Sequence, residues 1–488
     1  MKTHSGGLQR ILTTARQMAN RTLSRFGYLA GGALTKQRLK AGVFIGTAAA
    51  AGLLIAARPG PKYVAHEWGT FTSVQGGDGV LLDWRPLETS RLPKFVYDWK
   101  HPGLGRVASS ALLFGKGGMV TLQRMETPVI YFYSEKQQDV DVSVDFPKGL
   151  ITEWYPQATQ IGPSMKPAPA AIAAADNILH KAGAKPDFTL ASLVDGMVTK
   201  KSRAYWSHIH ILPEQKNLNA SLLLDKSGSH YFSARETDAS LLQMESLVST
   251  NPAPELEQFI FYRGVGNFAT PLRVTMSQSR DADGASKITV ANTGKDPLEH
   301  LFLLGVEKGK GKFISLKRMA ANEQCAIDFD ASTGLMPLSS VSEKLAGAMK
   351  QSLVSAGLYP REAAAMVKTW NDSWFQEDGL RVLYILPRAW TDETLPLKLD
   401  PAPRELTRVM VGRAEVIAPA AQQKLALTLA RASRGDEKAQ DEMVSELRKL
   451  GRFAEPALRL ANDKAPAEMV QTGWKLLETA KQAESGLL

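Results

Sequence analysis

The distribution of charge along the chain is the sequence feature that most restricts its fold and its location. The first 66 residues contain ten lysines and arginines and no aspartate or glutamate. The remaining residues carry 49 basic and 49 acidic side chains, so the formal net charge of +10 resides in the N-terminal segment. Basic residues confined to one terminus are typical of a targeting or membrane-orienting segment, whereas a nucleic-acid-binding protein carries them on its folded body. We therefore expect no nucleic-acid partner.

An uncharged stretch of 17 residues, 41–57, follows the basic segment. As an α-helix it would extend about 25 Å, at the short end for crossing a hydrocarbon layer of ~30 Å. Eight basic residues precede it, so the positive-inside rule places the N-terminus in the cytoplasm and the body in the periplasm. We interpret 41–57 as a retained anchor, single-pass in the inner membrane. The alternatives are a signal peptide cleaved after Ala57, a mitochondrial-type transit peptide and a buried helix of a soluble protein.

Composition removes several classes of protein. The only cysteine, Cys325, has no partner for an intramolecular disulfide, so a hydrophobic core must hold the body together. The chain has 488 residues, of which 44% are apolar, enough for such a core. It contains no P-loop, G-x-S-x-G, H-E-x-x-H or C-x-x-C motif. The better-marked nucleotide-binding, hydrolase and redox classes are therefore excluded.

Short stretches with a period of two residues dominate the first part of the body. From Asp139 to Phe146, apolar side chains alternate with acidic or hydroxyl side chains, which predicts a half-buried antiparallel strand. Many further short apolar runs with turn signals between them favour a β-sandwich. The fold class expected is α+β, with a predominantly antiparallel β-sandwich body, a helical C-terminal segment and one N-terminal membrane helix.

The period changes to that of helices near residue 337. Ser340 to Glu343 resembles a capping box, and Gly357 is placed to end the helix that follows. The tail sequence around Leu450 to Leu458 is similar to HEAT-type helical hairpins. Two such hairpins rarely stand alone, so we expect the tail to dock on the body or on a protein partner. The expected divisions are a basic cytoplasmic segment, the anchor, a β-rich sandwich, a mixed helix and strand segment packed on the sheet, and a helical tail: 1–40, 41–57, 62–336, 337–418 and 419–488.

The most unusual sequence in the chain is HEWGTFTS at 66–73. It resembles the opening of a family of exported bacterial proteins that carry this motif just after their signal segment. Five further stretches match the pattern of that family: 124–133 (RMETPVIYFY), 153–156 (EWYP), 261–268 (FYRGVGNF), 370–375 (WNDSWF) and 381–384 (RVLY). The resemblance spans most of residues 64–415 and implies export, but it carries no established activity. No catalytic residue can therefore be transferred from it.

Four residues are candidates for chemistry. His66 and Glu67 are catalytic candidates, and because they are adjacent in a predicted strand they should point to opposite faces. His208 and His210 should share one strand face with Trp206, about 6–7 Å apart at Cα. They would fill two positions of a zinc or iron site if a carboxylate or a third histidine completed it. The candidates for completing it are His66, Glu67, Glu214 and His230; the alternative is that both are ordinary strand histidines.

A glycine-rich stretch, Gly264 to Ala269, matches the G-x-G-x-x-A fingerprint of dinucleotide-binding folds. Pro271 and a strand follow it, where that fold requires a helix, so we predict a turn between strands. The function that the sequence favours is a membrane-anchored exported protein that binds or scaffolds. The alternative is a metal-dependent hydrolase or oxygenase that uses His208 and His210 together with Glu67.

Overall fold

The computed structural model describes most of the body and the tail. The described residues are 63–86, 92–93, 95–98, 120–163, 201–213, 229–245, 254–277, 287–329 and 333–485. The predicted basic segment, 1–40, and the predicted anchor, 41–57, lie outside them. Within these described ranges, no helix combines the length and the apolar character needed to cross a membrane.

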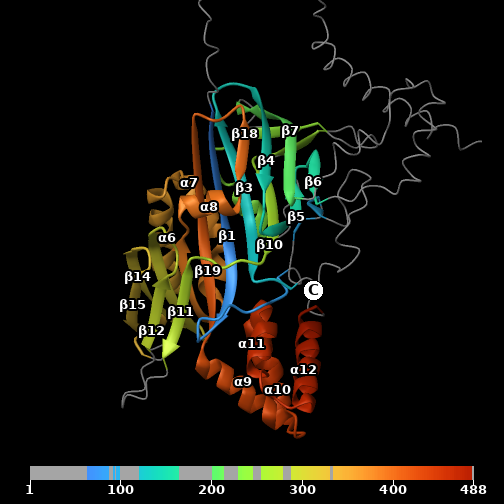
Figure 1. Cartoon of the computed structure of the whole chain (residues 1–488), viewed down its shortest axis with the longest axis vertical. Coiled ribbons are helices and arrows are strands. Elements are labelled where there is room, and N and C mark those ends of the chain that lie inside the picture. Colours follow the sequence, from blue (N-terminus) through green and yellow to red (C-terminus); the bar gives the residue numbers. More distant parts are fainter. Residues whose placement is uncertain are drawn as a thin grey trace, which may run out of the picture. The chain divides into compact units, whose positions relative to one another are not determined.

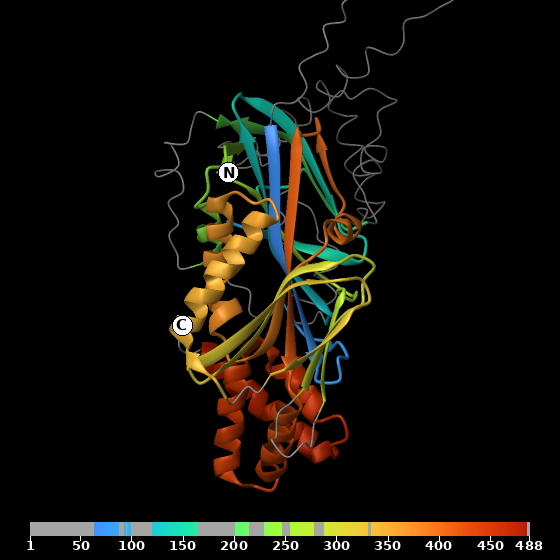
Figure 2. The ribbon, with the colours of Figure 1, turned by 90° about the vertical axis from the view of Figure 1, so that its left-hand side faces the viewer.

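The largest sheet has ten strands among the described residues. In spatial order they are β16 (Met336–Pro337), β14 (Lys310–Met319), β13 (Leu298–Glu307), β17 (Gly379–Ile385), β19 (Glu405–Ile417), β1 (Tyr63–Gly76), β3 (Gln123–Ser134), β10 (Ile260–Gly266), β5 (Gly149–Tyr155) and β2 (Tyr97–Asp98). β1 and β19 are parallel and every other neighbouring pair is antiparallel. Figures 1 and 2 show β1 and β19 running side by side. Strands from the two ends of the sequence thus lie next to each other within this sheet.

Two smaller antiparallel sheets complete the β-structure that is described. One contains β11 (Leu272–Ser277), β12 (Lys287–Asn292) and β15 (Gln324–Asp328). The other contains β18 (Leu397–Asp400), β4 (Gln138–Asp145), β7 (Arg203–Leu212), β8 (Leu241–Met244) and β9 (Glu255–Glu257), with β6 (Gln160–Gly162) also paired to β7. β4 confirms the alternation predicted at Asp139 to Phe146, because Val140, Val142 and Val144 are buried.

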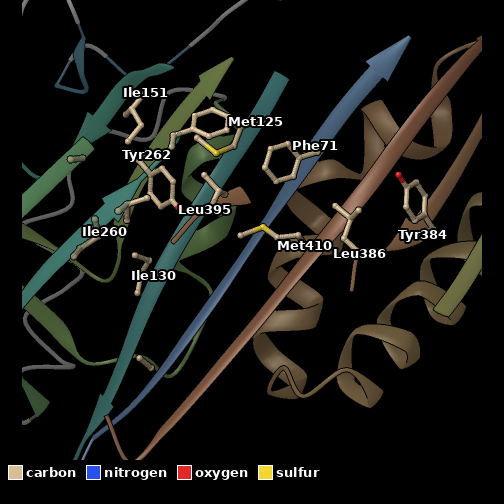
Figure 3. Close-up of a cluster of buried hydrophobic side chains, with 14 of the residues drawn as sticks. Phe71, Met125, Ile130, Ile151, Ile260, Tyr262, Tyr384, Leu386, Leu395 and Met410 are labelled. Carbon is tan, nitrogen blue, oxygen red and sulfur yellow. The ribbon is translucent and has the colours of Figure 1, made fainter. Parts of the chain in front are cut away.

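β1 is buried along its whole length because both of its faces are covered. On one face, Ala65 and Phe71 join a hydrophobic core that includes side chains from all three sheets. Figure 3 shows Phe71 of β1 on the same side of the sheet as Met125 of β3 and Met410 of β19. On the other face, Trp68 joins a second core that includes helical side chains. The main sheet is therefore a layer between two cores.

Helices supply much of the second core. They are α6 (Leu338–Ser355), α7 (Pro360–Asn371), the π-helical turn η3 (Asp372–Gln376) and the 3-10 helix η2 (His230–Arg235); a further helix, α8 (Arg388–Thr394), follows β17. α6 begins at Leu338, whose backbone N–H donates to the Gly309 carbonyl at 2.9 Å, and Pro337 is its N-cap. The predicted capping box at Ser340 is therefore wrong, because the first turn already has a partner in the β13–β14 hairpin. Gly357 follows the helix with a φ of 111°, a conformation suited to glycine.

The tail consists of α9 (Pro419–Ala432), α10 (Glu437–Leu450), the 3-10 turn η4 (Gly451–Phe453), α11 (Ala454–Ala461) and α12 (Ala467–Ser485). A third core joins these helices to Val74, Trp84 and Ile417 of the body. The Trp84 and Phe453 rings lie 5.5 Å apart between centroids. The tail therefore docks on the body, and a protein partner for its helices stays a prediction.

The α+β class, with mostly antiparallel sheets and C-terminal helices, is confirmed. The mixed segment 337–418 supplies β17 and β19 to the middle of the main sheet, as well as helices that cover one of its faces. Its two strands are almost wholly buried, so they lack the alternation that marks a half-buried strand.

Candidate functional site

The stretches that carry the family resemblance come together in the main sheet. They lie on β1, β3, β5, β10 and β17, and at the junction of α7 with η3. Five of these six stretches belong to strands that occupy adjacent or nearly adjacent positions, in the order β17-β19-β1-β3-β10-β5. Residues more than 300 positions apart in sequence thus form one continuous surface of the sheet. The polar side chains on these strands are therefore the candidates for a functional site.

His66 lies on the face of β1 that is turned toward α7. Its Nδ1 lies 2.7 Å from the Oε2 atom of Glu362, and both side chains are fully buried. When the Glu362 carboxylate is ionised it can only accept hydrogen bonds, so Nδ1 is then the donor of this contact. Nε2 has no hydrogen-bond partner in the part of the chain that the structure describes. This is the geometry in which a carboxylate orients a histidine.

Aromatic rings enclose this pair. The Tyr359 ring lies 4.4 Å from the His66 ring and the Tyr133 ring lies 5.5 Å from it, between centroids. The Tyr133 hydroxyl and the Tyr359 backbone N–H each donate to Glu362 at 2.7 Å. Burial, together with the Glu362 carboxylate, raises the pKa of Tyr133 far above its ordinary value, so the hydroxyl keeps its proton. Glu362 therefore accepts three hydrogen bonds inside the second core.

Glu67 lies on the opposite face of β1. It accepts hydrogen bonds from the Nε atom of Arg408, at 2.5 Å, and from the hydroxyl of Tyr262. Arg408 also donates to Asp392 at 2.7 Å. Burial disfavours the charged guanidinium, but Glu67 and Tyr262 outweigh burial and raise the pKa of Arg408. His66 and Glu67 thus have separate sets of partners on opposite faces of the strand, and the structure does not bring them together.

A β-bulge changes the predicted arrangement of His208 and His210. The register between β4 and β7 shifts between Val140 and Val142, and His208 has a φ of 57°. Trp206 is fully buried and donates to the Pro156 carbonyl at 2.8 Å, whereas the His208 side chain is 57% exposed. Trp206 therefore does not share a face with the two histidines, and the prediction that it does is wrong. Strand spacing alone gives no sign of such a bulge.

Each of these histidines lies beside an aspartate. His210 Nδ1 is 2.6 Å from Asp139, and His208 Nδ1 is 3.8 Å from Asp141. Within the described residues there is no group of three or more His, Cys, Asp or Glu side chains arranged to hold a metal ion. Glu214 lies outside the described residues. Metal binding by His208 and His210 stays a prediction, which metal analysis of the purified chain and of His210→Ala would test.

Sequence reasoning missed a group of buried charged side chains, which we call the arginine cluster. It consists of Arg124 and Glu126 on β3, Glu153 on β5, Arg263 on β10 and Arg452 on η4. The four residues on strands are between 1% and 6% exposed. Those four belong to the stretches that resemble the exported family. The signal that could have identified them is the presence of charged residues inside strands that are otherwise apolar.

The contacts within the arginine cluster are unequal. Arg452 donates to Glu126 at 2.8 Å, whereas the ion pair between Arg124 and Glu126 is 3.9 Å long. The Nε atom of Arg124 has no hydrogen-bond partner among the described residues. Burial, together with the Arg263 charge, lowers the pKa of Arg124 to about 9, against the opposing effect of Glu126. The protein thus buries a guanidinium whose ion pair with Glu126 is long and whose Nε atom has no partner among the described residues.

A neighbouring group of charges on the same sheet makes many hydrogen bonds, although the Nη1 atom of Arg413 has no partner among the described residues. Arg381 on β17 donates to Glu415 at 3.0 Å and to the main-chain carbonyls of Trp374 and Glu377 at 3.2 Å and 2.6 Å. Arg413 on β19 donates to Glu415 at 2.8 Å and to Glu377 at 2.6 Å. These bonds show how this sheet holds a buried arginine when the chain supplies its partners.

Comparisons with known proteins assign no identity. No family model matches the chain, and no curated protein matches it. Among solved structures, the Fcho1 Mu homology domain of Danio rerio with a bound Eps15 peptide matches with 7% identity and a TM-score of 0.27, covering 74% of this chain and 100% of that domain. The yeast delta-COP-I mu-homology domain complexed with a Dsl1 peptide matches with 8% identity and a TM-score of 0.23, covering 73% and 96%. At these TM-scores the similarities indicate neither a fold family nor a function for this chain.

Proposed function

We propose that this chain is an exported protein, anchored in the inner membrane by residues 41–57, whose body binds a ligand in the periplasm. The charge distribution supports the orientation, because the basic residues before the uncharged stretch favour the cytoplasmic side. The body carries equal numbers of basic and acidic side chains, so its charge gives no preference for one side of the membrane. The resemblance to an exported family supports the same location.

The observation that carries a binding role is the poorly compensated charge of Arg124. Burying an ion pair costs free energy of desolvation, and apolar residues of similar volume often stabilise a fold equally well or better. The ion pair between Arg124 and Glu126 is 3.9 Å long, and the Arg124 Nε atom has no hydrogen-bond partner in the described part of the chain, although Arg124 is 2% exposed. Strained or unsatisfied groups concentrate at functional sites. We therefore place the ligand-binding site at the arginine cluster.

Membrane extraction tests the anchor. After alkaline extraction of membranes, the full chain should stay in the pellet, because an uncharged helix in the bilayer resists removal of peripheral proteins. Ala49→Arg places a charge at the centre of the stretch, which costs about 3 kcal/mol of insertion free energy and should release the chain or block its export. Ala49→Leu is the matched control and should stay in the pellet.

Protease added to cells with a permeabilised outer membrane tests the orientation. The body should be degraded while the N-terminal segment is protected. Release of the unaltered chain into the alkaline supernatant would contradict the anchor. Protection of the body until the inner membrane is broken would contradict export.

A further inference from the structure

We propose that the arginine cluster binds a small oxyanion of the phosphate, sulfate or carboxylate type. This inference rests on the proposed ligand-binding function and names the class of ligand. Arg124, Arg263 and Arg452 all act electrostatically on the same carboxylate, that of Glu126. They come from β3, β10 and η4, so the sheet and the tail both contribute to the site.

The carboxylates around the cluster are unevenly engaged. Glu126 and Glu153 both act on Arg124, and Glu377 also acts on Arg452, but the ion pair from Arg124 to Glu126 is 3.9 Å long. A buried charge without a counterion is strongly unfavourable. Glu126 is already engaged by Arg452 at 2.8 Å, so it serves Arg124 poorly. An oxyanion beside Arg124 would give the unpartnered Nε atom a close negative acceptor.

The donor set also suits an oxyanion. A guanidinium presents its N–H groups as a planar fork that matches two oxygens of a carboxylate or phosphate. Arg124 Nε lacks a partner, and so does the hydroxyl of Thr70, within the described residues. Thr70 lies directly opposite Glu126 in the β1–β3 register and is 1% exposed. Arg124 on β3 and Thr70 on the adjacent β1 therefore each offer a donor atom that is buried and has no partner among the described residues.

Burial restricts the size of the ligand. Arg124 is 2% exposed and Arg263 is 6% exposed, whereas the Arg452 side chain on η4 is 12% exposed. Such burial would exclude a large phosphorylated molecule, so the ligand we propose is a small ion. Arg452 is the member of the cluster closest to solvent by this measure, so we place the entry of the ion at η4.

Arg381 provides an internal comparison. It is fully buried in the same sheet, and its guanidinium donates to Glu415 and to three main-chain carbonyls. The fold thus supplies partners where an arginine has a structural role. The Nε atom of Arg124, in contrast, has no hydrogen-bond partner among the described residues, which is the difference that a ligand would remove.

The test compares the full chain, purified in detergent, with Arg124→Met. Thermal unfolding is followed in sodium phosphate, sulfate or acetate against sodium chloride of equal ionic strength. We expect at least one oxyanion to raise the unfolding midpoint in a saturable way, and Arg124→Met to weaken that binding about tenfold or more. Phosphate and sulfate also stabilise folded proteins in general. The quantity to compare is therefore the rise in unfolding midpoint that each salt causes in the wild type and in the variant.

Arg318→Met is the matched control. Arg318 lies on β14, its side chain is 64% exposed, and its ion pair with Glu299 is 3.4 Å long. This control should keep the full oxyanion response. If Arg124→Met does not fold, Arg452→Gln takes its place, since Arg452 is more exposed, and it should lose the response.

Three results would overturn the proposal. One is equal midpoints for the wild type in all four salts, and another is a full oxyanion response in Arg124→Met or in Arg452→Gln. The third is a response only to phosphatidylglycerol vesicles, which would point to a lipid headgroup. Binding is measured in detergent and is independent of location, so a chain that binds oxyanions but proves cytoplasmic would contradict export alone.

Discussion

At the scale of single residues, the distinctive property of this protein is the set of acidic and basic side chains buried inside its main sheet. Glu362 collects three donors around His66, Glu67 pairs with Arg408, and Glu126 pairs with Arg452. A buried carboxylate contributes to stability only while its partners satisfy it. Each of these contacts can therefore be tested by removing one partner.

Removal of Glu362 should destabilise the fold strongly. Glu362→Ala leaves His66 Nδ1, the Tyr133 hydroxyl and the Tyr359 backbone N–H without their acceptor. We expect a loss of about 3–5 kcal/mol in the free energy of unfolding, measured in urea. Glu343→Ala, at an exposed position on α6, should change it by less than about 0.5 kcal/mol. Equal effects of the two variants would contradict a structural role for the His66 contact.

Glu126 should make the protein sensitive to acid. Burial disfavours its charged form, but Arg452, Arg124 and Arg263 outweigh burial and lower the pKa of Glu126 to about 2. Between its ordinary pKa near 4.5 and this value, the unfolded chain binds a proton that the folded chain does not. Stability therefore falls as pH decreases through that range, and the contribution of about 3 kcal/mol at neutral pH falls by about 2 kcal/mol at pH 3.

Urea titrations of the wild type and Glu126→Gln at pH 7, 4 and 3 would measure this contribution. The variant should be less stable at pH 7 and should lose less stability on acidification. If the free energy of unfolding falls by the same amount in the two proteins, Glu126 titrates in the folded state much as it does in the unfolded chain.

At the scale of elements, the sequence predicts strands best where one face meets water. β4 shows its burial as an alternation, so its bounds were predicted within a residue or two. β1 and β19 are buried on both faces, which removes that alternation, and their parallel pairing joins residues about 340 positions apart. The bulge at His208 and the early start of α6 depend on neighbouring elements, so local sequence does not predict them.

The glycines at 264 and 266 show a related limit. The sequence predicts a turn at this stretch, but both residues lie within β10. A Cβ on Gly264 would lie 2.4 Å from the Leu150 carbonyl oxygen of β5. The glycine therefore permits close approach of two strands, and the turn begins only after Gly266. The prediction of a turn is therefore wrong for Gly264 and Gly266, which lie in the strand, and the strand ends only in the last part of the predicted stretch.

Gly412 tests the packing of β19. A Cβ added there would lie 2.3 Å from the ring of the buried Tyr384 on β17. Gly412→Ala should therefore lower the free energy of unfolding by about 3 kcal/mol, measured by urea denaturation. Gly347→Ala is the matched control, because it lies in α6 with no atom near the added methyl and should stabilise by about 0.5–1 kcal/mol. Tolerance of Gly412→Ala would mean that Tyr384 can move.

At the scale of the whole described body, the tail and the sheet share charged and aromatic contacts. Arg452 pairs with Glu126, Arg85 donates to Glu455 at 2.6 Å, and the Arg413 guanidinium lies 5.0 Å from the centre of the Phe453 ring. The sequence predicts that the tail docks, but not which of its residues contact the sheet. The arginine cluster was missed for the same reason, since η4 and three strands must be assembled before it exists.

Phe453 is the residue that best tests this docking. It contacts Trp84 of the body and the guanidinium groups of Arg413 and Arg452. Phe453→Ala should lower stability by about 3–5 kcal/mol and increase hydrogen exchange in α11 more than in β3. Leu427→Ala, at a position 61% exposed on α9, should leave both quantities nearly unchanged. Uniform exchange increases in α11 and β3 would show that the tail and the sheet unfold as one unit.

Because β1 pairs with β19, the main sheet can be completed only after the chain has been synthesised beyond residue 405. β1 is the earliest described strand, and one of its two neighbours, β3, follows within about 50 residues. Its other neighbour comes near the end of the strand-forming sequence, so one edge of β1 stays without main-chain partners while most of the chain is being made. Unpaired edges are where chains associate wrongly. A nascent chain that stops before residue 405 would therefore expose the unpaired main-chain edge of β1, and such a chain should be prone to aggregation.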